Sequence, residues 1–383
     1  MALALYIHWP FCLAKCPYCD FNSHVRERTD VDAWEAALLA DMRHEAALTP
    51  GRALTSIFFG GGTPSLMPPA LVESLLIEAE RLWGFAPDIE ITLEANPSSV
   101  EAANFAALAT AGINRVSLGL QALDNTTLKF LGRLHDVTES LSALELAQRL
   151  FSRVSFDLIY ARPDHTPEAW EAELKRALGF GTGHLSLYQL TIEPGTRFAT
   201  LVREGKLAPL NDDEAGDLFN LTRDLTTAAG LPAYETSNHA RPGEESRHNL
   251  TYWRYQDYVG IGPGAHGRRL GMATVRHKKP ENYLRASAEQ GHGIAEARAL
   301  SPSDQAMEAV LMGLRLTEGI NPAQLAARFG FAEAHLIDPA KRQFYTNIGH
   351  LADSGSILRV TEQGAPLLEA LLAELVPDAL VSA

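Results

Sequence analysis

The sequence predicts an α/β fold: a partial barrel of six βα units, followed by a small, mostly helical C-terminal module that resembles a winged helix. Short apolar runs of strand length alternate six times with stretches of helical apolar spacing, which is typical of a parallel sheet with crossover helices. The alternation stops near residues 193–195, before a closed eight-unit barrel is complete. From about residue 303 onward, helical spacing dominates.

Each of the six units begins with a run rich in apolar or β-branched residues. The predicted strands are 2–9, 54–59, 89–94, 115–120, 154–159 and 184–190. The predicted helices are 32–48, one from about residue 69, 100–111, two separated near 132–133, 168–177 and 211–230. Chains that alternate in this way form right-handed crossovers, so the strands should be parallel neighbours.

Polar residues follow several of these strands at the point where each strand ends. They are the cysteine-containing loop after residue 9, the glycines at 60–62, Glu94, Gln121 and Asp157. In parallel α/β proteins, binding and catalytic groups lie at the carboxyl ends of the strands. We therefore expect these residues to meet at one edge of the sheet.

The last third of the chain has a different organisation. We predict a barrel at 1–230, a connecting region at 231–300 and a small domain at 301–383. A strand is predicted at 233–237. Within the small domain, helices are predicted at 307–316, 322–328, 344–352 and 361–375, with a short strand at 357–360. We interpret this domain as a packing lid and not as a nucleic-acid reader, because the chain is acidic.

Composition narrows the class of protein further. Hydrophobic residues make up 46% of the chain and charged residues 21%, with a net charge of −14. Such a balance is ordinary for a globular protein and argues against a surface that binds duplex nucleic acid. We find no signal peptide and no apolar run long enough to cross a bilayer. We expect a cytoplasmic protein whose thiols stay reduced.

The three cysteines lie together in one loop. Cys12, Cys16 and Cys19 have the spacing CxxxCxxC and are the only cysteines in the chain. Thiolates are strong ligands for iron–sulfur clusters and for zinc. Three of them can hold three irons of a [4Fe–4S] cluster and leave the fourth iron open. A zinc site with His8 or His24 as fourth ligand is the alternative, and the odd count argues against a disulfide framework.

The cysteine loop and the sequence Gly60-Gly-Gly-Thr-Pro64, one βα unit later, together resemble the radical SAM superfamily. The resemblance implies that S-adenosylmethionine (SAM) binds the open iron through its amino and carboxylate groups. It also implies that one electron from the cluster can cleave SAM to a 5′-deoxyadenosyl radical. The glycines would let the backbone approach the methionine part of SAM closely.

The resemblance extends to the oxygen-independent coproporphyrinogen III oxidase group, whose SAM contacts match nine positions here. These are Tyr6, Tyr18, Gly61, Gly62, Thr63, Glu94, Gln121, Arg133 and Asp157. Carboxylates accept hydrogen bonds from hydroxyl and ammonium groups, and an arginine can hold a carboxylate with two parallel hydrogen bonds. Taken singly, each residue is also explained as an ordinary polar group at a strand end.

Within that group, the sequence most resembles the HemW heme chaperones over nearly its whole length. His248-Asn-Leu-Thr-Tyr-Trp253 matches their HNxxYW motif, and Phe21 stands where the oxidases have a fourth cysteine. The resemblance implies that His248 is a heme ligand, with Tyr252 and Trp253 beside the porphyrin. Motif spacing alone leaves open a structural, hydrogen-bonding role for His248 and Asn249. Further candidates are His266, His277 and Lys278, and for the propionates Arg247 or Arg254.

These observations lead to one functional hypothesis and one alternative. The hypothesis is a heme chaperone on a radical SAM scaffold that binds a [4Fe–4S] cluster, SAM and heme, uses an electron donor, and delivers heme to acceptor hemoproteins, including any at the membrane. Nucleic acid is not an expected partner. The alternative is an oxygen-independent coproporphyrinogen III oxidase, an enzyme that decarboxylates its porphyrin substrate with SAM. We assign no catalytic residue, and whether SAM is cleaved stays open.

Overall fold

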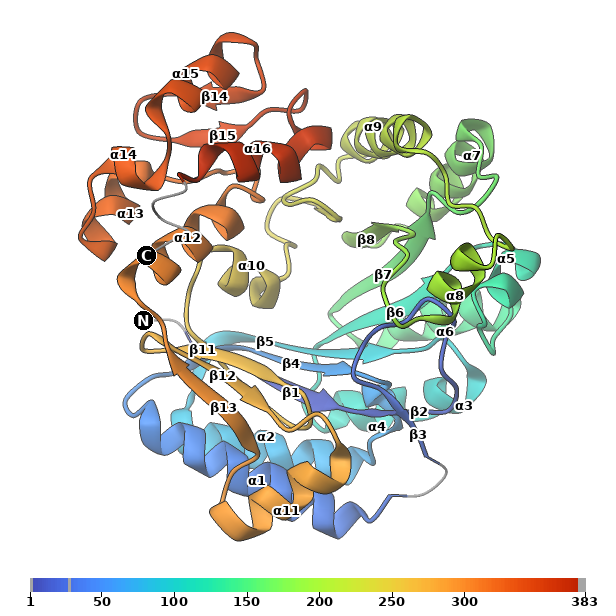
Figure 1. Cartoon of the computed structure of the whole chain (residues 1–383). Coiled ribbons are helices and arrows are strands. Elements are labelled where there is room, and N and C mark those ends of the chain that lie inside the picture. Colours follow the sequence, from blue (N-terminus) through green and yellow to red (C-terminus); the bar gives the residue numbers. More distant parts are fainter. Residues whose placement is uncertain (1–2, 27–28, 378–383) are drawn as a thin grey trace.

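A computed structural model describes residues 3–26 and 29–377 (Figure 1). Residue 2 of the first predicted strand and residues 378–383 of the predicted small domain lie outside these ranges. Six parallel strands are neighbours in chain order within one sheet. They are β1 (Leu3–Trp9), β4 (Leu54–Gly61), β5 (Phe85–Ala95), β6 (Arg115–Gln121), β7 (Arg153–Tyr160) and β8 (His184–Gln189). This order confirms the predicted partial barrel.

Helices follow the strands as the alternation predicts. They are α1 (Val31–Leu48), α2 (Pro69–Trp83), α3 (Ser99–Ala102), α4 (Phe105–Thr110), α5 (Asn125–Phe130), α6 (Val137–Leu150), α7 (Pro167–Leu178), α8 (Arg197–Arg203) and α9 (Asp212–Ala228). Side-chain caps fix several starts: Asp30 begins α1 and Asn211 begins α9, while Asp136 and Glu139 form a capping box at α6. In Figure 1, α1 and α2 lie against one face of the sheet.

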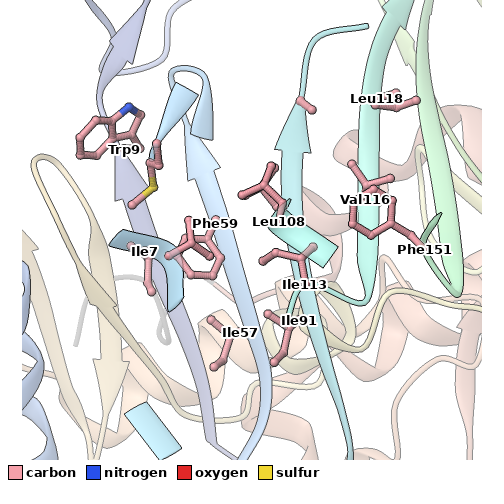
Figure 2. Packing of buried hydrophobic residues seen from close by; sticks show 14 of the residues in the cluster. Ile7, Trp9, Ile57, Phe59, Ile91, Leu108, Ile113, Val116, Leu118 and Phe151 are labelled. Carbon is pink, nitrogen blue, oxygen red and sulfur yellow. The ribbon is translucent and has the colours of Figure 1, made fainter. Parts of the chain in front are cut away.

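The two faces of the parallel strands carry different chemistry. Apolar residues at alternate positions face the helices and form the main core, for example Ile57 and Phe59 in β4 and Val116 in β6. Figure 2 shows these side chains gathered with Leu108 of α4. The positions between them are mostly polar or aromatic and face the inside of the barrel, because successive strand residues point to opposite faces. The inner face therefore supplies the site.

Residues after 230 extend the same sheet at both ends. β10 (Tyr258–Ile261) pairs in parallel with β1, and β11 (His266–Arg269), β12 (Met272–Arg276) and β13 (Ile294–Ala299) continue antiparallel. β9 (Asn238–Ala240) adds to β8 at the other edge, and α11 (Pro280–Gln290) connects β12 to β13. Sequence reasoning missed β10–β13, which are short. The predicted domain boundaries stay a prediction.

Two predicted elements are wrong. The strand predicted at 233–237 is mainly a bend, because the Glu235 carboxylate accepts hydrogen bonds from Ser237 N and Asn238 Nδ2 and turns the chain before β9 begins. The helix predicted at 344–352 is α15 (Pro339–Asn347), which begins where Asp338 caps it and ends before Gly349, a residue with φ +83°.

The C-terminal module has a core of its own. It contains α12 (Pro302–Gly313), α13 (Pro322–Phe329), α14 (Glu333–Leu336), α15, the hairpin β14 (Leu351–Asp353) and β15 (Leu358–Val360), the 3₁₀ turn η2 (Ala365–Leu367) and α16 (Leu368–Leu375). Leucines of α12, α16 and the hairpin pack together inside it. This arrangement confirms a small, mostly helical module. Across the described ranges, every helix is too short or too polar to span a lipid bilayer.

Candidate functional site

The cysteine loop follows β1 directly and is closed by a short pairing between β2 (Phe11–Cys12) and β3 (His24–Val25). Its three thiols are free and partly exposed. Burial raises the pKa of Cys12, and the nearby thiols of Cys19 and Cys16 raise it further. Thr63 Oγ1 donates to Cys12 Sγ at 3.5 Å. Within residues 3–26 and 29–377, no three His, Cys, Asp or Glu side chains are arranged to hold a single metal ion.

The glycines after β4 pack directly against this loop. Gly61 has φ +114°, and a Cβ there would lie 2.6 Å from the imidazole Cε1 of His8. A Cβ on Gly62 would lie 2.7 Å from the carbonyl oxygen of Phe11. The His8 ring is held in place by Tyr6 OH and by the carbonyl oxygen of Asn22, each at 2.9 Å. The glycine run therefore packs its backbone closely against the cysteine loop, where a side chain would have no room.

Arg133 connects the cysteines to the next strand ends. Its Nη1 donates to Cys16 Sγ at 3.5 Å and to Tyr18 OH at 3.4 Å, and its Nη2 donates to Asn96 Oδ1. Asn96 Nδ2 in turn donates to Thr63 Oγ1 at 3.3 Å. Sequence reasoning missed Asn96, although it stands two residues after Glu94 at the end of β5.

Two polar atoms in this cradle are buried and lack partners among the described residues: Arg133 Nε and Gln121 Oε1. Gln121 also adopts φ +68°, a left-handed conformation that is strained for a residue with a side chain. Buried polar groups normally find a partner. A ligand with both donors and acceptors, such as SAM beside a cluster, fits this cradle.

Two carboxyl groups face the inside of the barrel. Glu94 Oε2 accepts the backbone N–H of Gly61 at 3.2 Å, and Asp157 Oδ1 accepts the hydroxyl of Ser117 at 3.2 Å. Burial and the charge of Asp157 raise the pKa of Glu94 to about 8. Burial raises the pKa of Asp157 to about 6. Perturbed carboxyl groups in a cleft are typical of functional sites.

These carboxyl groups line a cavity of about 210 Å³ inside the barrel. Its walls also include Tyr6 and Phe58, and the far end includes Arg115, His184 and His248. The structure therefore brings Tyr6, Glu94 and Asp157 to the cavity, while Tyr18, Thr63 and Arg133 lie beside the cysteines. Gly61 lies between the cavity and the cysteine loop. Its backbone N–H donates to Glu94 on the cavity side, and it packs against the ring of His8, which precedes the loop.

The HNxxYW motif forms α10 (Arg247–Trp253), which contacts β4 and α12 from inside the barrel (Figure 1). His248 is 1% exposed, and both ring nitrogens have partners: Nδ1 lies 3.1 Å from Ser56 Oγ, and Nε2 bonds Tyr252 OH. Burial lowers the pKa of His248 to about 3, so the ring is neutral. Tyr252 lines the cavity, whereas Trp253 packs beside Tyr234 on a separate cluster.

The other predicted heme contacts lie elsewhere. His266 and Lys278 are exposed beside the cysteine loop, where Asn22 Nδ2 donates to the carbonyl oxygens of Pro263 at 2.8 Å and Lys278 at 2.9 Å. His277 is half-buried in the same turn. The two arginines predicted for the propionates are paired with carboxylates: Arg247 with Asp88 at 2.6 Å and Arg254 with Glu318 at 2.7 Å.

Comparisons with known proteins agree with this architecture. Residues 6–177 match the radical SAM superfamily, and residues 300–367 match the HemN C-terminal domain. The solved structure of coproporphyrinogen III oxidase (HemN) from Escherichia coli superposes with a TM-score of 0.83 at 23% identity, covering 97% of this chain and 89% of that one. At that identity, the likeness shows a shared fold.

Relatives found by sequence share a higher identity with this chain than the solved HemN structure does. The heme chaperone HemW of Escherichia coli (strain K12) is 38% identical over 380 residues, which is 97% of each chain. HemW of Bacillus subtilis (strain 168) is 32% identical over 94% of this chain and 95% of its own. The mitochondrial radical S-adenosyl methionine domain-containing protein 1 of Bos taurus is 39% identical over 83% of this chain and 74% of its own. The chain therefore belongs to the HemW family of the radical SAM superfamily.

Proposed function

We propose that this protein is a heme chaperone that binds a [4Fe–4S] cluster, SAM and heme, and passes heme to acceptor hemoproteins. The observation that carries the proposal is the match to HemW proteins over nearly the full length of both chains. Phe21 supports it, because this exposed phenylalanine occupies the position of the fourth cysteine of the oxidase motif and supplies no thiol. Its place of action would be the cytoplasm.

Cys12, Cys16 and Cys19 would hold the cluster, since three free thiols on one loop suit iron–sulfur ligation. When bound, the cluster supplies the electron for one-electron chemistry on SAM. The glycines at 61 and 62 would leave room for the methionine part. Arg133 and Thr63 would hold its charged end, with Tyr18 positioning Arg133. Glu94, Gln121, Asp157 and Tyr6 would bind the remaining polar groups from the barrel side.

Heme is proposed to bind through His248, with a specific structural consequence. Both ring nitrogens of His248 are hydrogen-bonded, so iron ligation requires Nε2 to lose Tyr252 or Nδ1 to lose Ser56. The cavity beside His248, about 210 Å³, is small for a whole porphyrin. Ligation by His248 therefore needs α10 to move, whereas His266 presents an exposed imidazole without such movement.

Cluster binding is tested by iron and sulfide analysis of anaerobically reconstituted protein. The wild type should carry iron and sulfide in equal amounts, and Cys12→Ser should lose most of both. A protein that instead carries zinc on the three cysteines contradicts the proposal. Phe21→Cys is the matched control, because it adds a thiol at the same loop without removing a ligand.

Heme binding is tested by absorbance titration of the same material. Wild-type protein should bind heme, and His248→Ala should shift the Soret band and weaken binding. His292→Ala removes a histidine on the far side of α1 and should bind like the wild type. If His248→Ala binds normally and His266→Ala does not, the ligand is His266. Production of protoporphyrinogen IX from coproporphyrinogen III with SAM and a reductant would contradict the chaperone function.

A further inference from the structure

Arg115, at the start of β6, is a buried cation that no carboxylate pairs. It is 3% exposed and lines the cavity inside the barrel. Its Nη1 donates to Thr92 Oγ1 at 3.3 Å and its Nη2 to Ser155 Oγ at 3.0 Å. Across the described part of the chain, no carboxylate oxygen lies within 4.0 Å of its guanidinium, and its other N–H groups have no protein acceptor. A buried arginine is normally paired.

Hydroxyl groups separate this cation from the nearest acid. Ser155 Oγ donates to Ser117 Oγ at 2.8 Å, and Ser117 Oγ donates to Asp157 Oδ1 at 3.2 Å. Arg115 therefore points its unused donors into the cavity and not at Asp157. Arg115 has no direct carboxylate contact among the described residues, although its charge acts across the cavity on Asp157 and Glu94 and lowers the pKa of each, against the larger effect of burial.

His184, at the start of β8, adds a second donor without a partner. It is 3% exposed and lines the same cavity. Its Nε2 lies 3.0 Å from Tyr234 OH, and that oxygen already accepts the backbone N–H of Ser246 at 3.4 Å. Among the described residues, His184 Nε2 is the one acceptor within reach of the Tyr234 hydroxyl hydrogen, so we assign that hydrogen to Nε2 and the ring proton to Nδ1. His184 Nδ1 is buried and has no acceptor among residues 3–26 and 29–377.

We propose that Arg115 and His184 form an anion site inside the barrel that binds a single carboxylate group. Arg115 and His184 each have an N–H group without an acceptor among the described residues, and both line the same cavity. A carboxylate can accept a hydrogen bond from each, because its two oxygens accept hydrogen bonds in one plane. The cavity volume of about 210 Å³ admits a small carboxylic acid or one carboxylate arm of a larger molecule. Tyr188, 42% exposed, lines the cavity and marks where it reaches solvent.

The site lies next to the cavity wall formed by Glu94 and Asp157, so a bound carboxylate would sit beside the proposed SAM position. The carboxylate has two sources: a free small acid, or a propionate arm of heme. The second source rests on the proposed heme function, whereas the first does not. The two sources are separated by using propionate alone and by comparing heme with its dimethyl ester.

The test is thermal unfolding of the anaerobically reconstituted full chain without SAM. A ligand that binds only the folded state raises the melting temperature with concentration. Sodium propionate should do so, while propionamide, a neutral molecule of the same shape, and sodium chloride at equal ionic strength should not. Arg115→Gln should abolish the propionate response. His184→Phe, which keeps the guanidinium, should weaken propionate binding about tenfold by removing one hydrogen bond to a charged group.

Arg276→Gln is the matched control, because it removes a buried arginine that is fully paired elsewhere. It should lower the melting temperature and keep the propionate response. Arg115→Gln should not lower it, since it removes an unpaired buried charge. If propionate has no effect but heme binds more tightly than its dimethyl ester in an Arg115-dependent way, the arm of heme is the source. Absence of both effects, or equal responses in wild type and Arg115→Gln, overturns the proposal.

Discussion

Two groups of buried charges in this protein are partnered in opposite ways. Between α1 and the sheet extension, Arg276 bonds Asp41 at 3.2 Å and Glu45 at 2.5 Å, and all three are fully buried. Arg269 bonds the same Glu45, and Tyr283 OH donates to Asp41 at 3.0 Å. Inside the barrel, the hydrogen bonds of Arg115 to described residues go to the hydroxyls of Thr92 and Ser155, and Glu94 accepts one backbone N–H.

The difference separates buried polar groups that satisfy one another within the fold from those that we propose bind a ligand. The first group joins α1 to β11, β12 and α11, so its charges are satisfied by one another across segments distant in the sequence. The second group is incompletely satisfied: Arg115 is buried without a carboxylate contact among the described residues, and Glu94 is half-buried beside the cavity. An unpaired buried charge destabilises the folded protein. We therefore expect such a charge where a bound molecule supplies the missing partner.

Removing Arg276 from its buried ion pairs with Asp41 and Glu45 should lower the free energy of unfolding the most. Arg276→Gln leaves Asp41 and Glu45 buried with a lost counter-charge, and we expect the free energy of unfolding to fall by about 3–5 kcal/mol. Denaturant unfolding monitored by circular dichroism measures this loss. Arg298→Gln, in an exposed pair with Asp304 at 3.0 Å, should cost less than about 1 kcal/mol. Equal losses in the two variants would show that the buried network is not stabilising.

A smaller loss is expected where the backbone itself lines the ligand site. Gly61→Ala places a Cβ against the His8 ring in a conformation with φ +114°, so we expect a loss of about 1–3 kcal/mol together with weaker SAM binding. Gly216→Ala is the control: this glycine lies inside α9 with open space around it and should gain about 0.5–1 kcal/mol. Parallel denaturation curves and SAM titrations measure both. If Gly61→Ala changes neither the free energy of unfolding nor SAM binding, the close packing of Gly61 against His8 is contradicted.

An effect of opposite sign, a gain of stability, is expected inside the barrel. The pKa of Glu94 is raised from 4.5 to about 8, so the folded state holds this proton more tightly than the unfolded state. Stability should therefore fall as pH rises from about 4.5 to 8. Glu94→Gln cannot ionise, so it should be more stable than wild type above pH 8 and should show no gain at pH 4.

Glu78 provides a control of opposite sign. Hydrogen bonds from Arg81 and Arg43 lower the pKa of Glu78 to about 2, so its stabilisation is present above about pH 4.5 and is lost as pH falls toward 2. Glu78→Gln should be less stable than wild type at neutral pH and equal to it in strong acid. Unfolding curves across pH compare the two variants. If both variants changed stability in the same direction at the same pH, the arginine partners of Glu78 would not account for its lowered pKa.

Much of the barrel follows from sequence patterns. The six parallel strands were recognisable because each is a short apolar run followed by helical spacing, and the polar residues at their ends mark one edge. β10–β13 were missed because strands of four to six residues carry weak patterns, and β13, at the edge of the sheet, is largely exposed. His248 was chosen by motif, and motif spacing carries no information about the Ser56 and Tyr252 partners that enclose its ring.

The proposal of a cluster site needs no knowledge of the fold, because Cys12, Cys16 and Cys19 lie within one local loop and their spacing is visible in the chain itself. Packing between distant segments sets which buried charges have a partner of opposite charge. In the sequence, Arg115 and Arg276 are both single arginines within strand-like runs. Strand register places Arg115 opposite Thr92 and Arg153, whereas helix packing brings Asp41 and Glu45 to Arg276. Partners that lie distant in sequence are chosen by packing.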